Sequence, residues 1–60
     1  MKARLINGAV VDMQAKFTRA MGETAQMAQI IRKFTAELEN AETHEFPAIK
    51  ARYAAMLASV

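Results

Sequence analysis

The sequence predicts an all-α protein, a helical hairpin of one long and one short helix that associates as a coiled-coil-like oligomer. Helix is favoured because the chain of 60 residues has only two glycines and one proline, while 53% of it is hydrophobic. An apolar repeat over about residues 3–42 predicts the long helix, and a proline followed by a second repeat predicts the short helix over residues 47–60. We expect a single helical domain over residues 1–60, with a turn at residues 43–46.

An apolar stripe defines the long helix. Positions spaced alternately by three and four residues, from Ala3 to Ala41, are apolar in eleven of twelve cases, and none is charged. This is the 3.5-residue repeat of a coiled-coil seam, and it continues without interruption past Gly22. A straight helix of this length would extend about 60 Å, so it could not bury the stripe against itself.

Local signals mark the end of the long helix and the start of the short one. Asn40 is a poor residue for a helix interior, and Phe46 is disfavoured from helical angles because a proline follows it. Pro47 suits the first turn of a new helix. Apolar residues from Ile49 to Val60 continue a helical spacing, so the short helix should fold back over about the last third of the long one.

The length of the chain favours a partner, because a domain this small buries only about 60% of its unfolded surface. The sequence has no cysteine and one histidine, so association with itself or with a larger protein is the favoured way to cover the stripe. We therefore expect a dimer or larger oligomer and a protein-binding surface of apolar residues. The expected protein-binding residues are Ile6, Val10, Met13, Phe17, Met27, Ile31, Phe34, Leu38, Ile49, Tyr53 and Met56.

No combination of residues indicates catalysis, a cofactor or a metal. His44 lies at the expected turn, where a single histidine is most often solvated. No glutamate and histidine have the spacing of a helical metal site, and the glycines do not form a phosphate-binding loop. No apolar run approaches the roughly 20 residues of a membrane span. We expect a soluble, cytoplasmic, non-enzymatic protein that acts as a small regulator, inhibitor or adaptor.

A different interpretation starts from the N-terminal residues. Asn-Gly at positions 7 and 8 is a strong β-hairpin signal, although no other segment supplies the third strand that such a hairpin needs. If residues 2–6 form a strand instead, a helix can follow from Gly8, Gly22 can close that helix, and Thr24 can cap the next one.

This order of strand, helix, glycine turn and helix resembles the ribbon-helix-helix family of dimeric DNA-binding repressors. The resemblance covers about 35 residues and implies that two chains pair their strands and read the major groove of DNA. It implies contacts from Lys2 and Arg4 to bases or phosphates, and a phosphate held by Thr24. Residues 1–33 carry six basic and two acidic side chains, which is compatible with nucleic acid as a partner.

A second face of the expected long helix carries small residues at seven-residue spacing. Positions 8, 15, 22, 29 and 36 are Gly, Ala, Gly, Gln and Ala. Small side chains let another backbone approach closely. This face therefore adds a third hypothesis, a structural subunit of a helical assembly.

Overall fold

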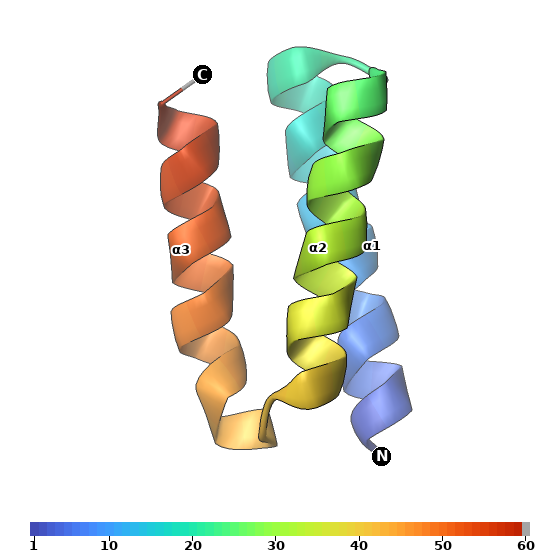
Figure 1. The fold of residues 1–60 in the computed structure, drawn as a ribbon, viewed down its shortest axis with the longest axis vertical. Helices are drawn as coiled ribbons and strands as arrows, with labels where there is room; N and C mark the ends of the chain where they lie inside the picture. The colour runs from blue at the N-terminus through green and yellow to red at the C-terminus, as the bar shows by residue number, and fades with distance from the viewer. Residues whose placement is uncertain (60) are drawn as a thin grey trace.

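Three helices packed side by side form the protein, as a computed structural model of the chain shows for residues 1–59 (Figure 1). The helices are α1 (Lys2–Met21), α2 (Ala25–Asn40) and α3 (Phe46–Ala58), and a short 3₁₀ turn, η1 (Thr43–Glu45), precedes α3. Helices α1 and α3 run in the same direction, and α2 runs back between them in the sequence (Figure 1). The expected all-α class is confirmed, and residues 1–59 contain no strand.

The expected continuous helix over residues 3–42 is wrong, because the chain turns back after Met21. Gly22 has a φ of 76°, which an L-residue with a side chain rarely adopts, and its amide donates to the Thr18 carbonyl at 2.9 Å. The Thr24 hydroxyl then accepts the amide of Met27 at 3.1 Å and so caps α2. The fold is therefore a bundle of three helices within one chain, and not a two-helix hairpin.

The periodicity could not reveal this break. Two helices that fold against each other need the same three-and-four spacing of apolar residues as one long coiled-coil helix. The stripe continues in register across Gly22, so only the local signals of a positive-φ glycine and an N-capping threonine distinguish the two outcomes.

The second connection agrees closely with the expected turn at residues 43–46 and helix from residue 47. The amide of Glu42 donates to the Glu45 carboxylate at 2.8 Å, and the amide of Glu45 donates to the Glu42 carbonyl at 2.9 Å. This reciprocal pairing closes η1. Pro47 occupies the first turn of α3, which begins one residue earlier than expected, at Phe46. The expected last residue of the helix, Val60, lies outside the described residues.

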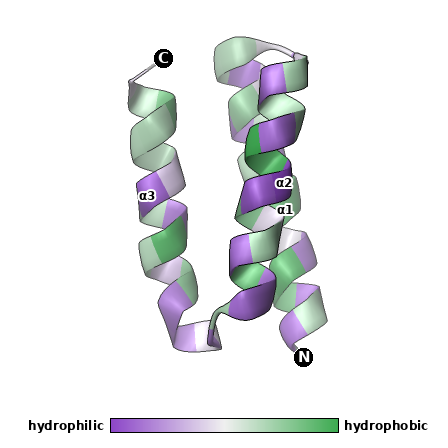
Figure 2. Ribbon diagram, viewed as in Figure 1, coloured by the Kyte–Doolittle hydropathy of each residue, from purple (hydrophilic) through white to green (hydrophobic). Residues whose placement is uncertain are grey.

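All three helices contribute to one apolar core. Hydrophobic and hydrophilic residues alternate along each helix, as expected of helices with one buried face (Figure 2). The most completely buried side chains are those of Met13, Phe17, Phe34 and Leu38. The ring of Tyr53 on α3 meets that of Phe34 on α2 edge to face, with centroids 5.0 Å apart.

The N-terminal residues are helical, so the β-hairpin at Asn7-Gly8 and the strand over residues 2–6 are both wrong. Ile6, Ala9 and Met13 are buried, and a helix is the conformation that places residues at this spacing on one face. The ribbon-helix-helix interpretation is correct only in expecting the glycine turn and the threonine cap; the strand that would enter DNA is absent from residues 1–59.

The small residues at positions 8, 15, 22, 29 and 36 do not share one helix face. Gly22 lies in the turn between α1 and α2, and the last two of these positions lie on α2. The geometric basis for the helical-assembly hypothesis is therefore lost.

Candidate protein-binding groove between α1 and α3

The expected protein-binding residues lie mainly in the core. Val10 and Ile31 are partly buried against the core, and Met56 is 43% exposed. A buried side chain cannot contact another protein while the fold is intact, so a binding surface has to involve other residues. The eight buried members of the expected set are Ile6, Met13, Phe17, Met27, Phe34, Leu38, Ile49 and Tyr53.

The residues expected to contact DNA also have internal roles. The Lys2 ammonium group donates to the carbonyl of Glu39 at 3.3 Å, which joins the start of α1 to the end of α2. The Thr24 hydroxyl caps α2. Arg4 is exposed and lines a groove between α1 and α3.

The groove between α1 and α3 has a volume of about 800 Å³ and is open to solvent. It exists because two helices that are far apart in the sequence run side by side, each presenting a stripe of residues at helical spacing. The lining residues of α1 fall within residues 4–16, and those of α3 fall within residues 46–54. The groove is lined by Arg4, Leu5, Gly8, Ala9, Asp12, Met13 and Lys16 of α1, by Thr43, and by Phe46, Pro47, Lys50, Ala51 and Ala54 of α3.

Small residues keep this groove open. Gly8, Ala51 and Ala54 line it and are exposed, and a Cβ placed on Gly8 would meet no atom within 4 Å. Buried apolar side chains, including Met13 and Phe46, also line it and are continuous with the core. The groove therefore combines an apolar interior with walls that can accept side chains from another molecule.

The charged residues of the groove are mostly basic. Lys16 pairs with Asp12 one helical turn away, with 3.3 Å between the ammonium nitrogen and a carboxylate oxygen. Arg4 and the partly buried Lys50 form no ion pair with any residue that the structure describes. The groove thus carries two uncompensated positive charges beside its apolar interior.

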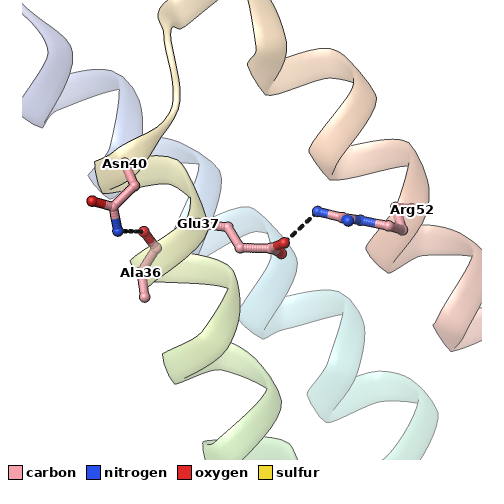
Figure 3. A network of polar contacts seen from close by, with 4 residues as sticks. All are labelled: Ala36, Glu37, Asn40 and Arg52. Carbon is pink, nitrogen blue, oxygen red and sulfur yellow. Dashed lines mark hydrogen bonds and ion pairs between the residues drawn. The ribbon is translucent and has the colours of Figure 1, made fainter.

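The space between α2 and α3 differs, because polar contacts bridge it. Figure 3 shows the guanidinium of Arg52 reaching from α3 to the carboxylate of Glu37 on α2. The same guanidinium lies 5.8 Å from the centre of the Tyr53 ring. Burial of the ring, together with the adjacent Glu37 carboxylate, raises the pKa of Tyr53 to about 12. These contacts hold α2 and α3 together.

Among residues 1–59, no three histidine, aspartate or glutamate side chains lie close enough together to hold a metal ion. His44 is exposed in η1. None of the helices of residues 1–59 has the length and apolar character needed to cross a membrane.

Sequence reasoning missed most of the groove residues. Gly8 drew attention for its size, but Leu5, Lys50, Ala51 and Ala54 did not. The small residues at positions 51 and 54 of α3 share a face with Lys50, and this pattern was a usable signal.

Comparison of the chain with models of protein families, with curated proteins and with solved structures finds no match.

Proposed function

We propose that this protein is a small non-enzymatic interaction module, a regulator, inhibitor or adaptor, that binds another protein through the α1–α3 groove. The groove itself carries the proposal, because its apolar interior, small-residue walls and charged edge are features of surfaces that accept a helix from a partner. Leu5 adds support as a large hydrophobic side chain that is 48% exposed at this groove.

The proposal differs from the sequence-based expectation in where binding occurs. The sequence predicts self-association because a single rod cannot bury its stripe, whereas one chain of this bundle buries eight of the eleven expected protein-binding residues. A second chain is therefore not needed to cover these residues. The open groove and the small size of the domain still favour a partner.

Site-specific photo-crosslinking tests the proposal in cells of the source organism. A photoreactive amino acid replaces Leu5, which lines the groove, or Val11, which is on the same helix, is 65% exposed and lies outside the groove. Leu5 should give a discrete adduct to another protein, and Val11 should give little. Equal adducts from both positions, or none from Leu5, would contradict the proposal.

The mass of the adduct separates the possible partners. An adduct of twice the mass of this chain would indicate self-association through the groove. An adduct of another mass would indicate a different protein, which mass spectrometry can identify.

A further inference from the structure

We propose that the occupant of the α1–α3 groove is an acidic amphipathic helix of about three turns from another protein. This inference rests on the proposed function and specifies the chemistry of its partner. It is carried by the charge of the groove together with its shape.

The length of the groove matches a short helix. The lining residues of α1, from Arg4 to Lys16, extend about 18 Å along the helix axis, and those of α3, from Phe46 to Ala54, extend about 12 Å. A helix of about 10–12 residues has the corresponding length. Placed in the groove, it would complete a four-helix arrangement, with its apolar face against Leu5, Ala51 and Ala54, which line the groove and are exposed.

The charge of the groove favours an acidic occupant. Arg4 and Lys50 are unpaired among residues 1–59, and the one acidic residue of the groove, Asp12, is already paired with Lys16. Helices α1 and α3 also begin at the same end of the bundle, so the positive ends of their dipoles lie at that end (Figure 1). Carboxylates flanking the apolar stripe of the occupant would compensate these charges.

The apolar interior favours a peptide over a nucleic acid. Phosphate groups would gain from Arg4 and Lys50, but they would cover the exposed apolar surface of Leu5, Ala51 and Ala54 poorly.

Three synthetic helical peptides with one shared apolar stripe of alanine and leucine provide the probes. Their flanking positions are all glutamate, all glutamine or all lysine, and fluorescence anisotropy reports binding to the full chain. We expect the glutamate peptide to bind at least about tenfold more tightly than the lysine peptide, with a difference that shrinks as salt is added. Equal or tighter binding of the lysine peptide, or no binding of any peptide, would overturn the proposal.

Matched variants locate the binding. Ala54→Leu fills the groove, whereas Ala55→Leu makes the same change one residue away at an exposed position outside it. Only the first should weaken binding of the glutamate peptide, by about tenfold or more. Similar losses in both variants would place the peptide elsewhere and overturn the proposal.

A charge exchange keeps the test informative even where a variant weakens the fold. Lys50→Glu should lose affinity for the glutamate peptide and gain affinity for the lysine peptide. Lys33→Glu, on α2 outside the groove, should still bind the glutamate peptide more tightly than the lysine peptide. A gain of affinity cannot come from unfolding. Failure of Lys50→Glu to change the order of the peptides would argue against the groove as their site.

Competition and sedimentation test the other occupants. Displacement of the glutamate peptide by duplex DNA at physiological salt would favour a nucleic acid, and a dimer that Ala54→Leu dissociates would favour a second copy of this chain. Either result overturns the proposal of an acidic helix as the occupant.

If Leu5 crosslinks to a cellular protein while the peptides show no acidic preference, only this inference fails. If the peptides bind as expected and no crosslink forms in cells, the proposed function fails.

Discussion

The rings of Phe34 and Tyr53 meet edge to face, with an interplanar angle of 63° and 5.0 Å between their centroids. This contact joins α2 to α3 in the core, where Phe34 is fully buried and Tyr53 is 5% exposed. Replacing Phe34 by alanine removes the contact and leaves a cavity.

Phe34→Ala should therefore lower the free energy of unfolding by about 3–5 kcal/mol, measured by urea titration at equilibrium. Phe17→Ala, at an equally buried position of α1, should cost a similar amount. For a domain this small, such a loss is a large fraction of the total stability. The exposed Val11→Ala serves as the control, and a comparable loss there would contradict the assigned core.

The pKa of Tyr53 gives the stability a dependence on alkaline pH. The folded-state pKa of about 12 lies above the ordinary value of 10.0, so the unfolded chain loses the phenolic proton first as pH rises. Stability should be unaffected by this group below about pH 10 and should fall between about pH 10 and 12. Because the chain has one tyrosine, the ultraviolet absorbance of the phenolate reports this group alone.

The variant Glu37→Gln tests what raises the pKa of Tyr53. Burial is the largest contribution to the shift, and the Glu37 carboxylate adds to it. Removing that negative charge should bring the Tyr53 pKa part of the way back toward 10.0. An unchanged titration curve would leave burial as the whole cause.

The two glycines should respond to alanine in opposite directions. Gly8 lies inside α1 with open space around its Cα, so Gly8→Ala should stabilise the fold by about 0.5–1 kcal/mol. Gly22 has a positive φ, so Gly22→Ala should destabilise it by about 1 kcal/mol or more. Thermal unfolding of both variants checks this, and stabilisation at position 22 would contradict the turn between α1 and α2.

The N-cap of α2 predicts a further stability change. Thr24→Ala removes the hydroxyl that accepts the Met27 amide, and it should cost about 1 kcal/mol in the free energy of unfolding. Thr24→Ser keeps an acceptor and should cost much less. Equal losses in the two variants would mean that the methyl group, and not the cap, is responsible.

The sequence by itself determined the helical class and most of the core. The three-and-four spacing of Ile6, Ala9, Met13 and Phe17, and the four-residue spacing of Phe34 and Leu38, require helices that bury one face, whatever the path of the chain. Pro47 and the residues before it also marked the second connection to within one residue. These features depend on contacts between residues close in the sequence.

Only the tertiary structure decided how the apolar stripe is buried and where a partner can bind. A straight rod and a folded bundle share one periodicity, so the outcome depended on the conformation of Gly22 and on the gain from burying α1 against α2 and α3 in the same chain. The groove is formed by Gly8 and Ala54, which are 46 positions apart, and no local pattern encodes their proximity. A binding surface between two helices arises from their packing, and the packing was settled by the turn between α1 and α2.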